Sequence, residues 1–221
     1  MNKISLGCLA AAVVFAPQSV FAEGKLYTDL VIGAAFPSEV ETVDYEFTFD
    51  GDDYVGTGAI NYNPGVAGGA EVGVQGLFSN RFRIGVSYDF LHPKVDNVTF
   101  AGTVNGMPDS VTFSNEDIRA VGIELGNQAH VIQGNGYFVF PMQDGRFEPY
   151  IGGGAGVAFL ENTDTNFAYS GTAGVRYNVT ENAYIGFRYR FIRINNIMDD
   201  LGLEYDPIHA HVTSFVFGAH Y

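Results

Sequence analysis

The chain has 221 residues, a single cysteine and no tryptophan, and its 25 acidic residues against 11 lysines and arginines give a net charge of −14. This acidity excludes nucleic acid as an expected partner, because phosphate binding requires a basic surface. Hydrophobic residues make up 47% of the chain, yet beyond residue 22 no apolar run approaches the length of about 20 residues that a membrane-spanning helix needs. A strand-rich protein fits this composition better than a helical membrane protein.

The first 22 residues have the pattern of a secretory signal peptide. Lys3 precedes an apolar run over residues 4–15, and Val20-Phe21-Ala22 supplies the small residues of a cleavage site before Glu23. Lipidation of Cys8 is disfavoured, because most of the apolar run lies after this cysteine, whereas a lipidation motif would place the run before it. We therefore expect residues 1–22 to be removed on export and residues 23–221 to form one domain that lacks cysteine and has no disulfide framework.

Eight segments of the exported part alternate apolar and polar residues with a period of two. Each is about 9 to 14 residues long, which suits tilted strands, since such a strand crosses a bilayer in about 9–11 residues. In chain order they are Lys25–Phe36, Ala67–Phe78, Arg81–Leu91, part of Arg119–Phe140, Arg146–Phe159, Phe167–Val179, Ala183–Ile194 and His209–Tyr221. In the fourth segment polar residues fall on both faces over residues 128–136, which predicts a bulge, a glycine-rich bend or a strand that runs past the membrane.

The connections between these segments alternate in length. Short turns are expected at residues 79–80, 141–145 and 180–182, and longer connections at about 37–66, 92–118, 160–166 and 195–208. Outer-membrane barrels have short periplasmic turns and longer extracellular loops. The pattern therefore predicts an all-β, eight-stranded, antiparallel transmembrane up-and-down β-barrel in the bacterial outer membrane.

The alternation also assigns a face to each side chain. A soluble barrel or sandwich would turn the apolar face inward, but the signal peptide and the sorted connections favour apolar residues outside and charged residues in the lumen. Five acids and five arginines then share the narrow interior, where charges are tolerated only when paired. The predicted lumenal charge network comprises Asp29, Glu71, Arg81, Arg83, Asp89, Glu124, Glu148, Arg176, Arg188 and Arg190, with Gln75 on the same face. It favours a plugged lumen over an open channel.

Three stretches resemble the OmpA-like and opacity-type outer-membrane β-barrel family, which includes bacterial surface antigens. Residues 147–159 (FEPYIGGGAGVAF) are similar to the family's fifth strand and residues 171–177 (GTAGVRY) to its sixth. The last strand ends in an aromatic, with Phe215, Phe217 and Tyr221 on one face, which resembles the assembly signal that such proteins present to the barrel-assembly machinery. The resemblance implies a monomer in contact with membrane lipid and lipopolysaccharide.

We expect no catalytic site and no cofactor. The lipid A deacylase family carries a His and a Ser two residues apart after an arginine–aromatic pair, and this chain has Arg193 and Asn195 at those places; without a base and a nucleophile that reaction cannot proceed. His209 and His211 share a strand face and could bind a metal or act as bases, although polar residues are common at a loop–strand junction.

The two longest connections point to function at the cell surface. The connection at 37–66 is acidic and has no basic residue, and Asp50-Gly51-Asp52-Asp53 offers oxygen ligands for Ca²⁺ without the spacing of a calcium loop. The leading hypothesis is a structural, adhesive or antigenic surface protein with a host or extracellular ligand at its loops. A small pore or transport protein is the alternative, and a lipid-modifying enzyme is a third and weaker one.

Overall fold

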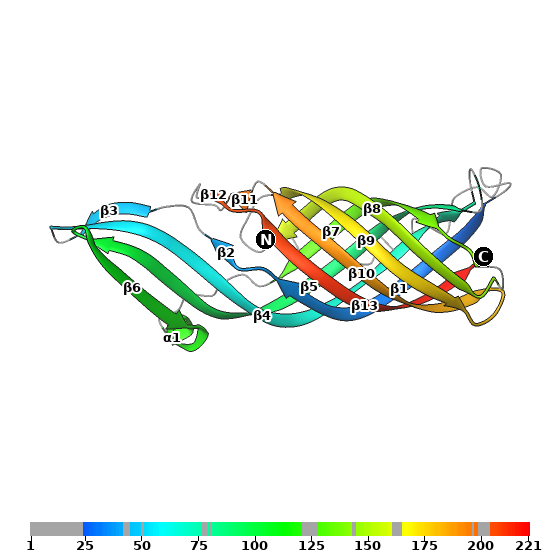
Figure 1. The fold of residues 1–221 in the computed structure, drawn as a ribbon, viewed down its shortest axis with the longest axis horizontal. Helices are drawn as coiled ribbons and strands as arrows, with labels where there is room; N and C mark the ends of the chain where they lie inside the picture. Colours follow the sequence, from blue (N-terminus) through cyan, green and yellow to red (C-terminus); the bar gives the residue numbers. More distant parts are fainter. Residues whose placement is uncertain are drawn as a thin grey trace, which may run out of the picture.

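Eight antiparallel strands close into a barrel in the computed structural model (Figure 1), which describes residues 24–41, 45–49, 51–76, 79, 81–120, 128–142, 145–160, 165–195, 197–198 and 204–221. The strands are β1 (Lys25–Pro37), β4 (Asp52–Gln75), β5 (Phe82–Val104), β7 (Ala129–Val139), β8 (Phe147–Leu160), β9 (Thr165–Asn178), β10 (Ala183–Asn195) and β13 (Ile208–His220). Each pairs with the next around the ring, and β1 pairs with β13 to close it. The predicted fold class is confirmed. Residues 1–22, the expected signal peptide, lie outside the described residues.

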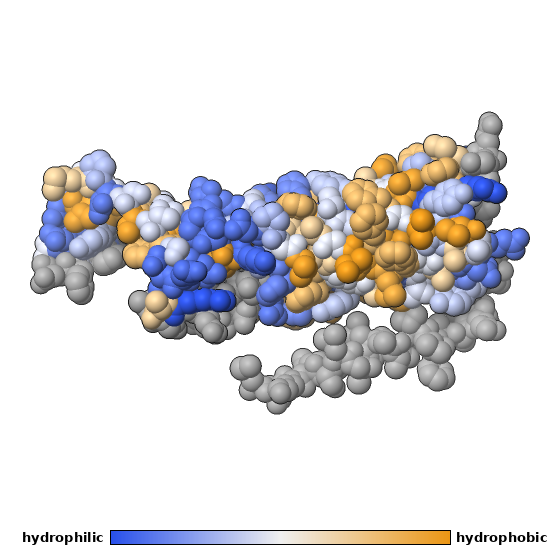
Figure 2. Space-filling view, turned by 90° about the horizontal axis from the view of Figure 1, so that it is seen from below, coloured by the Kyte–Doolittle hydropathy of each residue, from blue (hydrophilic) through white to orange (hydrophobic). Residues whose placement is uncertain are grey.

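The period of two explains the wall of the barrel. Along β10, the side chains of Tyr184, Arg188 and Arg190 are buried in the interior, whereas Ile185 and Phe187 between them are exposed. Seen from the side of α1, hydrophobic side chains cover much of the outer surface of the barrel (Figure 2). Within the described part of the chain, no helix has the length and apolar character needed to cross a membrane.

Short turns and the C-terminus share one end of the barrel. The turn between β9 and β10 is closed by hydrogen bonds from the amides of Val179 and Thr180 to the carbonyl of Ala183, at 2.9 and 3.0 Å. The turn before β8 uses Gly145 at φ 63°, a conformation that an L-residue adopts only with strain. This end is called the short-turn end below.

Strands β4 and β5 are about twice as long as their neighbours and run far beyond the barrel. They contain 24 and 23 residues, and their outer halves pair with each other and with β3 (Tyr45–Phe49) and β6 (Met107–Ser114). We call this four-stranded extension, formed by residues 45–49, 52–62, 95–104 and 107–114, the outer sheet; it projects from the end opposite the C-terminus (Figure 1). The long connections predicted at 37–66 and 92–118 are therefore mostly strand.

Local sequence explains how the outer sheet leaves the barrel and turns back. The β4–β5 register shifts between Asn61 and Tyr62 and again between Asn63 and Val66; such bulges bend and twist a ribbon. Asn105 and Gly106 have φ values of 51° and 78°, so both central residues of the β5–β6 turn are left-handed, as tight hairpins require. The short strand β2 (Val40–Glu41) pairs with residues 59–60 of β4, next to the register shift at Asn61.

A short helix, α1 (Asn115–Ala120), follows β6. The Ser114 hydroxyl accepts a hydrogen bond from the Asp117 amide and donates one to the Asp117 carboxylate at 2.6 Å, which is a reciprocal cap of the helix start. The Ser114 amide also donates to the Asp117 carboxylate, at 3.0 Å, and the two hydrogen bonds that this carboxylate accepts from Ser114 lower its pKa. Arg119 belongs to this helix, and the strand predicted within Arg119–Phe140 is β7 (Ala129–Val139), the later part of that range.

Of the three alternatives predicted for residues 128–136, the bulge is not found. Strand β7 pairs with β5 and β8 in continuous register, with Gln133 opposite Ser87 and Gly156. Its inward polar residues, such as Gln133 and Asn135, are buried among other polar side chains of the lumen. Polar residues on one face therefore reflect a polar interior, and the exposed Gly134 and Gly136 occupy the other face. Between β10 and β13, strands β11 (Ile197–Met198) and β12 (Glu204–Tyr205) form a separate pair.

Candidate functional site

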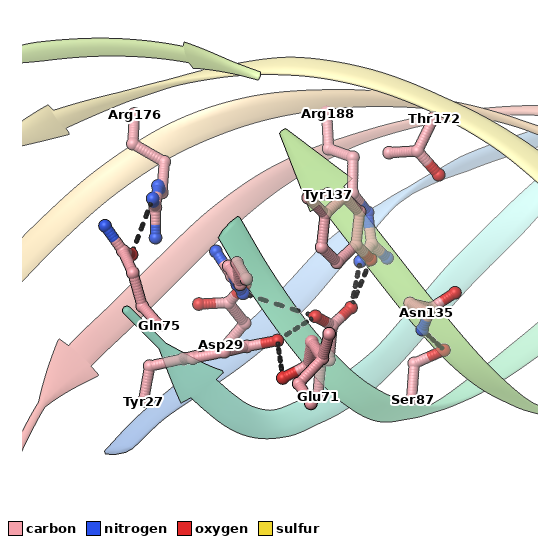
Figure 3. Close-up of polar contacts among 12 residues, drawn as sticks. Tyr27, Asp29, Glu71, Gln75, Ser87, Asn135, Tyr137, Thr172, Arg176 and Arg188 are labelled. Carbon is pink, nitrogen blue, oxygen red and sulfur yellow. Dashed lines mark hydrogen bonds and ion pairs between the residues drawn. The ribbon is translucent and has the colours of Figure 1, made fainter. Parts of the chain in front are cut away.

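The carboxylate of Glu71 lies at the centre of the barrel interior. Its side chain is 1% exposed, and the hydroxyls of Tyr27 and Tyr137 donate hydrogen bonds to its two oxygens, each at 2.6 Å. Figure 3 shows these side chains entering the lumen from different strands. The strand register places further polar side chains at the same height, because Asp29 and Ser87 stand opposite Glu71 on the two neighbouring strands.

Three arginines surround this centre and match three acids. Arg83 pairs with Asp29 and lies 3.3 Å from Glu71 Oε1. Arg188 lies 2.9 Å from Asp89 Oδ1 and 3.6 Å from Glu71 Oε2. Arg190 pairs with Asp89 and lies 3.4 Å from Glu71 Oε2. Buried charges are tolerated when each has a partner and further hydrogen bonds, and here the three positive and three negative charges cancel.

A second group of polar residues lies nearer the short-turn end. Arg176 is fully buried and forms an ion pair with Glu148 at 2.9 Å and a hydrogen bond to Gln75 at 3.0 Å. Its guanidinium lies 4.9 Å from the centre of the Tyr184 ring, a distance at which a cation is attracted to an aromatic face. This pair adds no net charge, so the interior remains balanced.

Each of the four lumenal tyrosines lies over a glycine on the neighbouring strand. Tyr27 stands opposite Gly73 and Tyr137 opposite Gly152, and the remaining two pairs are Tyr150 with Gly174 and Tyr184 with Gly218. A Cβ added at Gly218 would collide with the Tyr184 ring. The glycines therefore provide the space in which large rings fit inside a narrow barrel, an arrangement in which aromatic rings cover the glycine backbone.

The lumen changes character toward the outer sheet. There most inward side chains are apolar, although the buried Asn166 stands opposite Ala158. The apolar cluster comprises Ala35, Ala67, Leu91, Ala129, Val131, Ala158, Ala168, Ile192, Ile194, Ala210 and Val212, with Leu160 and Ile208 packed against it. The sequence interpretation considered only the lumenal charges and missed this cluster, although Leu91, Ile192 and Ile194 occupy inward positions of the same alternation. Charge network and apolar cluster together fill the interior along its length.

Some residues of the predicted network lie elsewhere. Arg81 shares the face of Arg83 but is exposed at the short-turn end, and Glu124 lies outside the described residues. The predicted assembly residues Phe215, Phe217 and Tyr221 are all exposed on the outer surface. The Tyr221 amide donates to the Leu26 carbonyl at 2.9 Å, so the C-terminus is held against β1.

His209 and His211, which the sequence singled out, lie on the outside of the barrel beside aromatic rings, and so does His130 of β7. The Tyr189 hydroxyl lies 2.6 Å from His211 Nδ1, and the Tyr88 hydroxyl lies 2.7 Å from His130 Nδ1. His209 lies against Phe191, with ring centres 5.7 Å apart. In the part of the chain that the structure describes, no three His, Cys, Asp or Glu side chains are grouped to hold a metal.

Arg193 and Asn195, at the positions of the deacylase His and Ser, form a local hydrogen bond, and the acids Asp52 and Asp53 also accept local hydrogen bonds. Arg193 Nε donates to Asn195 Oδ1 at 2.9 Å. Asn105 Nδ2 donates to the Asp52 carboxylate at 2.6 Å, and the Thr48 hydroxyl donates to Asp53 at 2.7 Å. These carboxylates therefore serve as acceptors within the outer sheet.

The outer sheet has one apolar face, set by cross-strand register. In one row across β2, β4, β5 and β6, Val40, Ile60, Val98 and Phe113 stand opposite one another. The next rows contain Phe100 with Val111 and Val104 with Met107. The opposite face carries mainly Thr, Ser and Asn, and the hydroxyl oxygens of Thr99 and Thr112 share a hydrogen bond at 3.0 Å. The sequence interpretation treated this region as loops and missed both faces.

Comparison with known proteins gives a family and several structures of low similarity. Residues 6–221 match the family described as outer membrane protein beta-barrel domain. Among solved structures, Neisserial surface protein A is 13% identical (89% of this chain, 97% of that chain, TM-score 0.49), and OprG from Pseudomonas aeruginosa is 12% identical (90% and 96%, TM-score 0.49). The outer membrane protease OmpT from Escherichia coli is 11% identical (89% and 97%, TM-score 0.46). No curated protein matches the chain.

Proposed function

The chain belongs to the outer membrane protein β-barrel domain family, and on that premise we propose that it is a surface protein that acts through its outer sheet and not through its lumen. The barrel is the anchor in the bacterial outer membrane. The sheet is the part that meets other molecules, in a structural, adhesive or antigenic role. Catalysis has no place in this proposal.

The filled lumen is the observation that carries the proposal. A solute would have to displace the ion pairs of Glu71 and Asp89, and removing one partner of a buried pair costs about 3–5 kcal/mol. It would then have to cross the apolar cluster around Val131 and Ile192, which offers no hydrogen-bonding groups to water or to a polar solute. Both barriers oppose a transport role, which is the alternative from the sequence.

The orientation follows the general architecture of such barrels, in which short turns face the periplasm and long connections face outward. The short-turn end, with the start of β1 and the end of β13, then faces the periplasm, and the outer sheet stands outside the cell. The proposal includes export with cleavage of residues 1–22, insertion by the barrel-assembly machinery through the strand that ends in Tyr221, and contact with lipopolysaccharide.

Two experiments test the proposal. In planar bilayers the purified chain should give no steady conductance, and a reproducible single-channel current would refute the closed lumen.

On intact cells, attachment to extracellular matrix and to host cells should depend on the chain. Replacing residues 40–62 and 95–126 by short turns should abolish attachment while the barrel still migrates as a folded, heat-modifiable band. Equal attachment by the trimmed barrel would refute a role for the sheet.

A further inference from the structure

The apolar face of the outer sheet leaves large hydrophobic side chains exposed beyond the barrel. Val111 is 44% exposed, Phe113 40% and Met107 68%, and register places all three on the face that also carries Val98 and Val104. Only part of this face is covered: Val98 and Val40 are buried, as is Ile118 of α1. Contiguous exposed apolar surface on a rigid element commonly marks an interaction site.

The outer sheet and α1 together carry a mostly negative charge. In the described residues 45–49, 51–64 and 93–120, seven acids stand against two bases, a balance of 2 − 7 = −5. The acids are Glu46, Asp52, Asp53, Asp96, Asp109, Glu116 and Asp117, and the bases are Lys94 and Arg119. Asp109 lies on the apolar face itself, in a cross-strand row with Gly102 and Gly56. Its carboxylate is therefore flanked by residues without side chains.

This charge decides among the occupants that an apolar face could have. The outer leaflet presents phosphates, so an acidic sheet is repelled by a lipid surface. A second copy of the chain would bring the same negative charge against itself, and like charges across an interface oppose association. A partner that carries positive charge together with apolar side chains is attracted by both properties of the face.

We propose that the apolar face of the outer sheet binds a cationic, apolar segment of another protein. The inference rests on the proposed function and names the chemistry of the partner. Aliphatic or aromatic side chains of the segment cover Val111, Phe113 and Met107, and its lysines or arginines pair with Asp109 and are attracted by the net negative charge of the sheet. Complementary charge speeds and orients the encounter, whereas burial of the apolar side chains holds the complex.

Strand β6 gives this partner a second means of attachment. It is the last strand in the order of the sheet, and every residue from Met107 to Ser114 is exposed. An extended segment can add to such an edge by main-chain hydrogen bonds, with alternate side chains directed to one face. A segment of alternating basic and apolar residues would meet the apolar face with every second side chain.

The test uses the full chain in detergent micelles and three synthetic peptides of equal length: one alternates lysine and phenylalanine, one lysine and serine, and one glutamate and phenylalanine. We expect measurable binding of the lysine–phenylalanine peptide alone, weakening as salt is raised from 50 to 500 mM. Equal binding of the lysine–serine peptide would show that charge suffices, and equal binding of the glutamate–phenylalanine peptide would show that charge is irrelevant; either result overturns the proposal.

Two substitutions on each face of the sheet locate the site. Val111→Ser should weaken binding about tenfold, the factor expected for losing one buried valine, whereas Val55→Ser, an equally exposed valine of the opposite face, should leave it unchanged. Asp109→Asn should also weaken binding, and Glu46→Gln, on the opposite face, should not. Equal effects on both faces would refute the assignment.

This inference and the proposed function can fail separately. If trimming the outer sheet abolishes attachment of cells but Val111→Ser leaves both attachment and peptide binding intact, the function stands and the apolar face is not the site. If peptide binding follows the predicted pattern but the trimmed barrel still attaches to surfaces, the binding face stands and the proposed function fails.

Discussion

Replacing Arg188 by alanine should destabilise the barrel, and the structure gives a size for the effect. The substitution removes the ion pairs to Asp89 at 2.9 Å and to Glu71 at 3.6 Å and leaves the interior with one uncompensated negative charge. Breaking a buried pair from one side costs about 3–5 kcal/mol. Because Arg190 still contacts both acids, we expect the lower end of this range.

The measurement is urea unfolding of the protein in lipid vesicles, followed by the heat-modifiable shift on gels. With a slope of about 1–3 kcal/mol per molar urea, a loss of about 3 kcal/mol lowers the midpoint by about 1–3 M. Arg81→Ala is the matched control, because this arginine is exposed at the end of the same face and a surface substitution changes stability by about 0.5 kcal/mol or less. Equal midpoints for the two variants would refute the charge network as a stabilising element.

Three further predictions concern the lumen, the helix cap and the outer hairpin. Gly218→Ala should destabilise the barrel by about 1–3 kcal/mol through overpacking against Tyr184, whereas Gly171→Ala, with no atom near its added Cβ, should not; a loss in both would contradict the fit of tyrosine over glycine. The pKa of Asp117, measured by NMR, should rise in Ser114→Ala, and an unchanged pKa would refute the cap. Because the folded-state pKa is lowered, the cap stabilises the helix above the ordinary pKa of aspartate, and this stabilisation is lost as pH falls through the folded-state pKa. Gly106→Ala should speed amide hydrogen exchange in β5 and β6 beyond residue 95, because φ of 78° strains any residue with a Cβ; unchanged exchange would count against that turn.

The alternation of residue types allowed the barrel and its faces to be predicted. A period of two fixes the face of each side chain once a strand is located, which is why Arg83, Arg188 and Arg190 were placed correctly inside. It does not fix the height at which a side chain enters the lumen. Arg81 shares the face of Arg83 but lies beyond the end of the barrel, so its predicted place in the network does not match the structure.

The outer sheet could not be recognised by comparing the lengths of the alternating segments with the thickness of a membrane. Residues 95–104 and 107–113 also alternate, with Val98, Phe100 and Val111 on one side, but they exceed the span of a bilayer and were assigned to loops. The choice of pairing partner for these strands depends on contacts distant in sequence, and alternation alone does not reveal it. The Tyr–Gly pairs of the lumen have the same origin, since each depends on the register between two strands.

The continuity of β4 and β5 from the barrel wall into the outer sheet has a mechanical consequence. A flexible loop would let a bound molecule rotate and move freely above the membrane, but a paired ribbon resists bending because its backbone hydrogen bonds must distort together. The shifts at Asn61 and Asn63 set the angle at which the ribbon leaves the wall. Tension on the sheet is therefore carried along the strands into the charge-paired interior. In the proposed role, a molecule bound to the sheet would be held at a defined height and orientation relative to the barrel.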